Sequence, residues 1–343
     1  MKSLWLYENK NKNIFNSLSS DINTDVCIIG AGIFGLTCGY YLAKFGLDVT
    51  IIDKNEIATK TTGHTTAKIT SQHGLIYTYL TNTYGEQFAK DYLFANEEAI
   101  TNIKNIIDNE NINCDFKNQS SFVYTVNQSE ISKIKEEVNC VNNLGFSANF
   151  VTKTGLPFDV AGAIQFKNQA QFNPIKYTNG LSNSIIKNNG HIYTNTIVYD
   201  IKNVGNTFYS LTTNGTIKSK YVILASHYPF INFPGMYFLK MYQSTSYVIG
   251  IDTKKTLFNG MYISSSKPTF SFRTAYYNGK EILLIGGCDH KTGSSVNYEQ
   301  SYGTLENYAK QLYPNCEVLF RWDTRDCITL DKIPYIGYFS NTM

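Results

Sequence analysis

Charged side chains are scarce in this sequence. Asp, Glu, Lys and Arg make up 17% of its 343 residues, whereas about a quarter is usual in soluble proteins. The 30 Lys and Arg residues nearly balance the 27 Asp and Glu residues, which leaves a net charge of +3. Nucleic-acid and membrane surfaces are bound through concentrated Lys and Arg, so we expect neither as a partner.

Paired metal ligands are missing as well. The seven cysteines are odd in number and contain no C-x-x-C pair, so we predict neither a disulfide framework nor a zinc or Rieske iron–sulfur site. No apolar run approaches the ~18 residues of a membrane span, and residues 1–13 contain no apolar stretch typical of a signal peptide. We therefore expect a cytoplasmic protein without a bound metal.

The apolar content is high enough for a large folded core. Hydrophobic residues make up 43% of the chain, and its length predicts two domains or one domain with an insertion. Residues 25–29 and 48–53 read as buried strands on either side of a helix at residues 36–45, which is a βαβ unit. Helical and strand patterns alternate from there to residue 322 without a linker, so we expect two interleaved domains and an α/β fold.

A glycine-rich turn follows the first predicted strand. Gly30, Gly32 and Gly35 form a G-x-G-x-x-G pattern, and Asp53 ends the next strand 18 residues after Gly35. In this context the glycines allow a tight turn, backbone approach to a pyrophosphate and close packing of the helix, while the acidic residue accepts hydrogen bonds from ribose hydroxyls. The pattern predicts a dinucleotide site but does not separate NAD from FAD.

The next segment favours FAD. Residues 59–70 consist largely of Thr, Lys, Gly and His, and such small hydroxyl side chains suit hydrogen bonding to a pyrophosphate and a ribityl chain. The alternative is a Thr-rich surface loop.

Several segments together resemble one enzyme family. They are the fingerprint with Asp53, TTGHTTAKITSQHG at 61–74, LLIGG at 283–287 and RWDTRDCITLDKIPYIG at 321–337. The chain resembles the D-amino-acid oxidase/glycine oxidase family of FAD enzymes, and within it a bacterial branch related to γ-glutamylputrescine oxidase whose members often carry a C-terminal Rieske domain, which is absent here. The resemblance implies a Rossmann-type FAD-binding domain (1–75, 160–235 and 318–343) with an interleaved α+β substrate domain on a mixed sheet (76–159 and 236–317).

The resemblance also assigns residues to the cofactor. The resemblance implies that the fingerprint region and a strand end near adenine bind the ADP half of FAD. The Thr-rich segment and a later strand end would bind the flavin side. The predicted cofactor-binding residues are Gly30, Gly32, Gly35, Asp53, Lys54, Thr61, Thr62, His64, Thr65, Thr66, Lys68, Val198 and Ser226. His64 is either a non-bonded neighbour of FAD or, as in some related amine dehydrogenases, its covalent attachment point. His227 replaces a glycine of the relatives.

The reaction that the resemblance implies is oxidation of a C–N bond by hydride transfer to flavin N5. It needs no catalytic triad or metal. The predicted substrate contacts are Tyr262, Arg273 and Asp326. Asp326 falls where relatives have a carboxylate-binding arginine, which favours an amine over an α-amino acid, although a turn-capping role is the alternative. An NAD(P)-dependent dehydrogenase and a flavin-binding protein without turnover are the competing interpretations.

The end of the sequence bears on activity. Relatives continue after PYIG with a strand, a Gly-rich turn and a helix, whereas this sequence ends at Met343. We therefore expect either a truncated chain or a second chain that completes the site. The expected partners are a small amine or amino acid and an electron-transfer protein, with a Rieske-type protein among the candidates.

Overall fold

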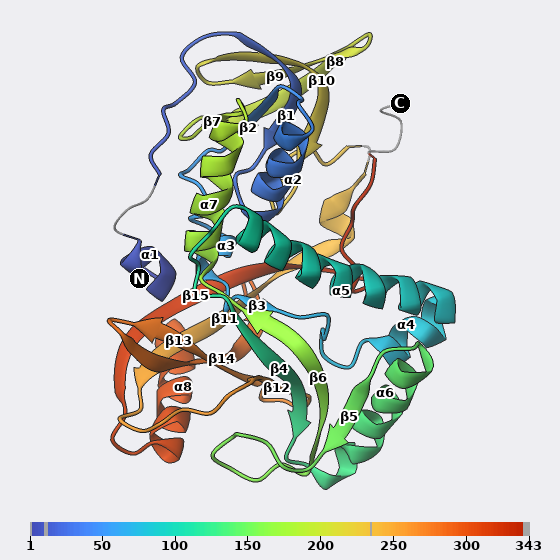
Figure 1. Ribbon diagram of the computed structural model, residues 1–343, viewed down its shortest axis with the longest axis vertical. Coiled ribbons are helices and arrows are strands. Elements are labelled where there is room, and N and C mark those ends of the chain that lie inside the picture. The colour runs from blue at the N-terminus through green and yellow to red at the C-terminus, as the bar shows by residue number, and fades with distance from the viewer. Residues whose placement is uncertain (1, 10–12, 234, 339–343) are drawn as a thin grey trace.

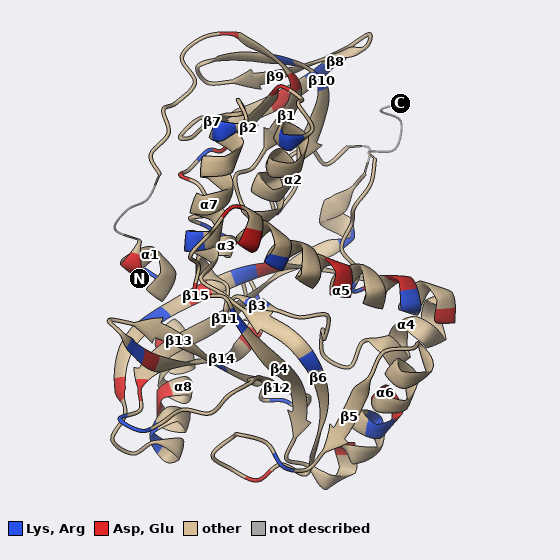
Figure 2. Ribbon diagram, viewed as in Figure 1, with Lys and Arg blue, Asp and Glu red and all other residues tan. Residues whose placement is uncertain are grey.

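The protein consists of two β-sheets with helices packed on them. The computed structural model describes residues 2–9, 13–233 and 235–338. In Figure 1 one sheet lies at the top, the other at the bottom, and helix α5 crosses between them. The mixed α/β fold that the sequence predicts is confirmed. Figure 2 shows acidic and basic residues interspersed over the elements of both halves.

The first sheet has six strands in the order β7-β2-β1-β10-β9-β8. Its strands are β1 (Ile22–Ile29), β2 (Val49–Ile52), β7 (His191–Tyr193), β8 (Val198–Val204), β9 (Thr207–Thr212) and β10 (Gly215–Leu224). Strands β7, β2, β1 and β10 run parallel, whereas β9 pairs antiparallel with both β10 and β8. All four residues of β2 are buried, as expected for a parallel strand covered on both faces.

Two helices pack together beside this sheet. Helix α2 (Ile33–Lys44) connects β1 to β2, which completes the predicted βαβ unit, and it packs against α7 (Pro174–Lys187). Asn173 caps α7 by accepting hydrogen bonds from the backbone N–H groups of Ile175 and Lys176.

The second sheet has nine strands in the order β15-β11-β14-β13-β12-β4-β6-β3, with β5 paired to β6. Its strands are β3 (Lys68–Ile69), β4 (Lys117–Thr125), β5 (Ala148–Val151), β6 (Gly162–Gln171), β11 (Met241–Asp252), β12 (Met261–Ser264), β13 (Phe270–Tyr277), β14 (Lys280–Lys291) and β15 (Glu317–Thr329). Only β12 and β4 pair in parallel; the other pairings are antiparallel, so this sheet is mixed.

The remaining helices mostly surround the second sheet. They are α1 (Leu4–Glu8), α3 (Thr61–His64), α4 (Tyr77–Tyr84), α5 (Glu86–Asn109), α6 (Ile131–Asn143), α8 (Tyr298–Leu312) and the short 3₁₀ helices η1 (Gln128–Glu130) and η2 (Tyr237–Leu239). Helix α8 packs on β11 and β14, and α6 packs on β5 and β6. Within the described ranges, no helix is long and apolar enough to cross a bilayer.

One hydrophobic core joins the two sheets. Its buried side chains include Ile28 and Ile51 from the six-stranded sheet and Ile69, Val248 and Trp322 from the nine-stranded sheet. The shared core is what the absence of a linker suggests.

The predicted domain division cuts the nine-stranded sheet at two places. The division groups residues 160–235 and 318–343 with the FAD-binding domain. These ranges contain β6 and all but the first residue of β15. Both strands pair with strands of the nine-stranded sheet. Strand pairing does not by itself divide a chain into domains, so the division stays a prediction. The predicted boundaries also include residues 1, 10–12, 234 and 339–343, which lie outside the described residues.

Candidate cofactor and active site

The glycine fingerprint lies where β1, β10 and α2 meet. Gly30 has a φ of +118°, and a Cβ placed on it would lie 2.4 Å from the carbonyl oxygen of Ala225 at the end of β10. A Cβ on Gly35 would lie 1.9 Å from the carbonyl oxygen of Gly30. Both positions therefore exclude a side chain, and this brings the N-terminus of α2 against the strand ends, where its free N–H groups form an anion site.

Asp53 organises the same turn. One oxygen of its carboxylate accepts a hydrogen bond from Ala31 N at 2.8 Å, and the other accepts one from Asn55 N at 2.8 Å. Each oxygen keeps a further lone pair for a ribose hydroxyl. Lys54, next in sequence, is exposed. Val198 packs in one hydrophobic cluster with Ile29 and Ile52, which end β1 and β2, so the structure brings it beside the fingerprint.

The Thr-rich segment begins at the N-terminus of α2. The hydroxyl of Thr62 accepts a hydrogen bond from Ile33 N at 3.1 Å, and a Cβ on Gly32 would lie 3.3 Å from the same oxygen. Thr62 therefore faces the position that the fingerprint reserves for a pyrophosphate.

From there the segment runs across the nine-stranded sheet, and we call residues 61–69 the strap. Its first half is held by side chains and backbone from distant parts of the chain. Thr61 Oγ1 donates to the carbonyl of Arg325 at 3.2 Å, Trp322 Nε1 donates to His64 O at 2.8 Å, and Trp5 Nε1 donates to Thr65 O at 2.7 Å.

Arg273 holds the second half of the strap. Its guanidinium donates to the carbonyls of Thr66 at 2.8 Å and Ala67 at 2.7 Å, and also to the carbonyls of Phe172 and Thr274. The side chain is only 3% exposed and lies 5.2 Å from the ring of Trp5. We expected Arg273 to face a substrate; the structure instead gives it four backbone carbonyls as partners, because the side chain of this β13 residue points into the core.

Burial changes the acidity of the two cations at this end. It lowers the pKa of Arg273 to about 9. Burial, and then the charge of Arg273, lower the pKa of Lys68 to about 7. Lys68 keeps some exposed surface although protein atoms surround most of the side chain, so its dehydration is incomplete.

His64 projects from the turn of α3. Its Nδ1 lies 2.8 Å from the carbonyl oxygen of Lys60, which favours a proton on Nδ1 and leaves a lone pair on Nε2. This tautomer suits either relation to FAD, so both interpretations of His64 stay predictions.

Tyr262 lies in the core of the second sheet. It is 2% exposed and stacks on Phe122 at 4.7 Å between ring centroids. Its hydroxyl donates to Asn259 O at 2.7 Å and accepts from Gly155 N at 3.1 Å. We expected this residue to face a substrate, but the hydroxyl is already satisfied within the protein.

Asp326 lies within β15, paired with Ser244 of β11, and not in a turn. Although part of it is exposed, surrounding protein raises the pKa of its carboxyl, and the nearby His227 opposes this rise. His227 has the left-handed φ of +63° that its glycine counterpart in relatives would adopt freely. Its Nε2 lies 3.4 Å from Cys327 Sγ. The neighbouring Ser226 donates to Tyr228 O at 3.2 Å.

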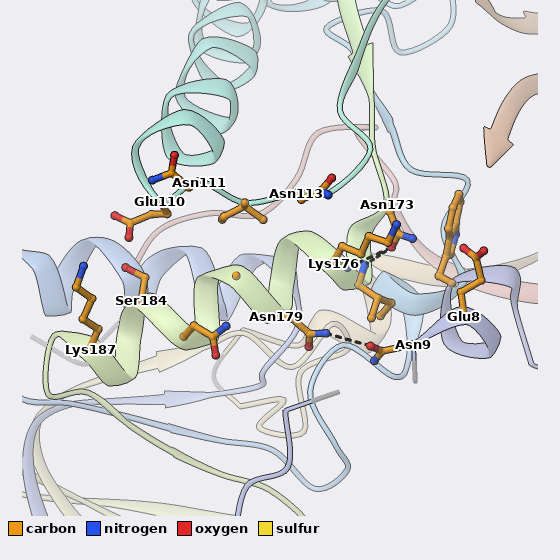
Figure 3. A pocket seen from close by; sticks show the side chains of 15 residues that line it. Glu8, Asn9, Glu110, Asn111, Asn113, Asn173, Lys176, Asn179, Ser184 and Lys187 are labelled. Carbon is orange, nitrogen blue, oxygen red and sulfur yellow. Dashed lines mark hydrogen bonds between the residues drawn. The ribbon is translucent and has the colours of Figure 1, made fainter. Parts of the chain in front are cut away.

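A cavity lies apart from the fingerprint. Its volume is about 680 Å³, and α1, α7 and the loop after α5 line it. Figure 3 shows several amide side chains around it, among them Asn111, Asn113, Asn173 and Asn179. The fingerprint glycines and Asp53 do not line this cavity, so we do not assign the cofactor to it.

Several contributors to the site were not predicted as site residues. Trp5, Trp322 and the carbonyl of Ala225 hold the strap or the fingerprint through contacts distant in sequence. Trp322 lies in the segment 321–337 that carries the family resemblance, whereas the only sequence signal for Trp5 is the rarity of tryptophan, since the chain has two.

The fold and the arrangement around the fingerprint define an FAD-dependent oxidoreductase. The chain belongs to the FAD dependent oxidoreductase (DAO) family, whose model matches residues 25–342. Its cofactor is accordingly FAD, and the residues around Gly30, Asp53 and Thr62 fit the ADP half of that cofactor.

Two curated proteins are similar in sequence. The putative Rieske 2Fe-2S iron-sulfur protein YhfW of Bacillus subtilis (strain 168) is 36% identical over 326 residues, which are 95% of this chain and 64% of that protein. The gamma-glutamylputrescine oxidoreductase of Escherichia coli (strain K12) is 23% identical over 222 residues, 62% of this chain and 51% of that protein. The chain thus spans less than two thirds of either relative.

Solved structures confirm the fold. Glycine oxidase from Geobacillus kaustophilus superposes with a TM-score of 0.77 at 17% identity and covers 93% of this chain and 86% of its own. L-proline dehydrogenase from P. horikoshii superposes with a TM-score of 0.72 at 18% identity, over 95% of this chain and 86% of its own.

Proposed function

We propose that the chain oxidises a C–N bond of an amine or amino acid. The observation that carries the proposal is the fingerprint joined to the strap: an anion site at the N-terminus of α2, a free lone pair on each oxygen of Asp53, and a segment that continues from Thr62 across the second sheet. This continuity fits a cofactor that extends well beyond an ADP moiety.

When bound, FAD supplies the acceptor for a hydride from the carbon beside nitrogen. The chain's own residues bind the cofactor and orient the substrate. Asp53 and Thr62 would hold the ADP half of FAD, and residues of the strap would contact its flavin side. On β15, the Asp326 carboxylate accepts an N–H of the substrate and orients its amine. Burial lowers the pKa of His227, so its imidazole is neutral near pH 7 and is able to take up the proton that the amine loses.

The test is optical. Purified protein reconstituted with FAD is titrated anaerobically with a panel of amines and amino acids, and loss of the oxidised-flavin band reports reduction of the flavin by the substrate. Flavin uptake with bleaching by at least one compound is the expected result. Flavin uptake without bleaching across the panel favours a flavin-binding protein without turnover, and failure to take up FAD while NAD(P)H fluorescence changes favours the dehydrogenase alternative.

We also propose an iron–sulfur protein as the electron acceptor, because the 36%-identical relative is named a putative Rieske protein and no group of His, Cys, Asp and Glu in the described part of this chain is suited to hold a metal. Stopped-flow reoxidation of the reduced flavin tests this. Faster reoxidation by an oxidised [2Fe–2S] protein of matched reduction potential, which accepts one electron per cluster, than by air-saturated buffer supports the partner, and the reverse order rejects it. A cytoplasmic location stays a prediction.

A further inference from the structure

One buried hydroxyl group beside the strap has no hydrogen-bond partner in the protein. Thr324 lies on β15, and its side chain belongs to a residue that is only 8% exposed. Across residues 2–9, 13–233 and 235–338, no group forms a hydrogen bond with its Oγ1 atom. Leaving a buried hydroxyl group unpaired is unfavourable. A molecule bound beside Thr324 would supply the missing partner.

The face of β15 that carries this hydroxyl group points toward the six-stranded sheet. Pairing with β11 is regular from Trp322 to Thr329, so Trp322, Thr324 and Asp326 extend from one face of the strand. Trp322 belongs to the hydrophobic core that joins the two sheets. Along this face, Thr324 is therefore the point at which the apolar core gives way to polar side chains.

The first half of the strap lies over the same part of β15. Trp322 Nε1 donates to His64 O at 2.8 Å, and Thr61 Oγ1 donates to the carbonyl of Arg325 at 3.2 Å. Thr324 lies between these two residues of β15, so its hydroxyl group is next to the strap. Thr61 and His64 are among the residues that we expect to contact FAD.

The loop after β10 approaches Thr324 from the other side. It contains His227 and also Ser226, which we expect to contact FAD. The imidazole of His227 interacts with the carboxylate of Asp326 and with the backbone of Arg325, the two residues that follow Thr324. The unpaired hydroxyl group therefore lies between the two segments that we expect on the flavin side of the cofactor.

We propose that the Thr324 hydroxyl group donates a hydrogen bond to the isoalloxazine ring of FAD and so orients the ring against β15. This rests on the proposed position of the flavin beside the strap. The ring has nitrogen and oxygen acceptors, and its reduced form carries more negative charge, so a donor at its edge favours reduction. Asp326, the proposed amine contact, lies two residues further along the same face, roughly 7 Å along the strand. The cofactor and the substrate amine thus have separate polar contacts.

The experiment compares the binding of FAD with that of ADP. Thr324→Val removes the hydroxyl group and keeps the branched shape of the side chain. Dissociation constants are measured by calorimetry on the full chain. We expect FAD to bind about fivefold more weakly than to wild type, whereas ADP, which lacks the flavin, binds as to wild type. The midpoint potential of the bound flavin should become more negative.

The melting temperature of the FAD-free protein provides a second measurement. Because the hydroxyl group of Thr324 makes no hydrogen bond within the protein, Thr324→Val should melt at or above the temperature of wild type. Thr324→Ser keeps the donor and should bind FAD nearly as wild type does.

Thr245→Val is the matched control. Thr245 is a buried threonine of the neighbouring strand β11, in register with Arg325 and thus on the opposite face of the sheet. Its hydroxyl group pairs with that of Thr292 at 2.8 Å. The control should lower the melting temperature of the FAD-free protein and leave the affinity for FAD unchanged.

Three results would overturn the proposal. The first is an unchanged FAD affinity and midpoint potential in Thr324→Val. The second is an equal loss of FAD and ADP affinity together with a lower melting temperature, because Thr324 would then support only the fold. The third is a failure of wild type to bind FAD. None of these measurements needs turnover, so a wild-type protein that binds FAD but is not bleached by any amine or amino acid counts against the proposed function alone.

Discussion

The fingerprint and the strap are built in opposite ways. Within the fingerprint, Ala31 and Asp53 contact one another across 22 residues, and glycine geometry defines the turn. The strap depends on partners that lie 60 residues away at Trp5, 207 at Arg273 and 264 at Arg325. The first is thus a local motif that any parallel βαβ unit is able to carry, whereas the second exists only when both sheets are assembled. Disrupting the fingerprint should therefore impair other properties of the protein than disrupting the strap.

The largest effect is expected from Arg273→Met. It removes the guanidinium donor from the carbonyls of Thr66, Ala67 and Phe172, of which only that of Ala67 keeps another donor, the backbone N–H of Phe172. Each carbonyl left unpaired costs about 1–3 kcal/mol. We expect the free energy of unfolding to fall by about 3–5 kcal/mol, measured by urea denaturation. Arg273→Lys, which keeps the charge but not the fork of donors, should recover only part of it; full recovery would mean that charge alone matters.

The substitution Gly35→Ala perturbs the fingerprint and not the strap. The new Cβ would meet the carbonyl of Gly30, and overpacking of this kind costs about 1–3 kcal/mol. Because the clash displaces the N-terminus of α2, we expect FAD affinity to fall more than tenfold in an equilibrium titration. Gly303→Ala, on helix α8 with open space around its Cα, is the control and should bind FAD normally.

Trp5→Phe removes a single donor from the strap. The carbonyl of Thr65 loses its indole partner, and we expect a loss of about 1–2 kcal/mol in unfolding free energy with little change in binding of ADP. A matching loss of ADP affinity would show that strap and fingerprint act as one unit.

The smallest effect is a pH dependence of the ligand-free protein. The pKa of Lys68 is about 7 in the folded state and about 10.4 in the unfolded chain. Between these values the unfolded chain binds more protons, so stability should rise with pH from about 7 to 10. Incomplete dehydration limits the gain to the order of 1–2 kcal/mol. Lys68→Met should flatten this slope in thermal melts recorded across that range, and an unchanged slope would assign it to other groups.

The sequence predicts the locally determined features of the structure well, and it predicts the features that depend on distant contacts poorly. Gly30, Gly35 and Asp53 take the positions that their spacing indicates, because one turn and two adjacent strands determine them. Arg273 and Tyr262 do not face a substrate as expected, since a strand such as residues 270–274 does not reveal which of its faces the core will cover. The edge strand β15 runs on to Thr329, well past residue 322, because pairing with β11 and not local composition sets its length.

The two indole rings give the protein an intrinsic optical reporter. Trp5 and Trp322 are its only tryptophans, and they donate to the adjacent carbonyls of Thr65 and His64. Every photon of indole fluorescence is therefore emitted next to the strap. An oxidised flavin alongside would quench that emission by energy transfer, so cofactor docking is measurable in unlabelled protein from fluorescence lifetimes, with Trp322→Phe and Trp5→Phe separating the two emitters.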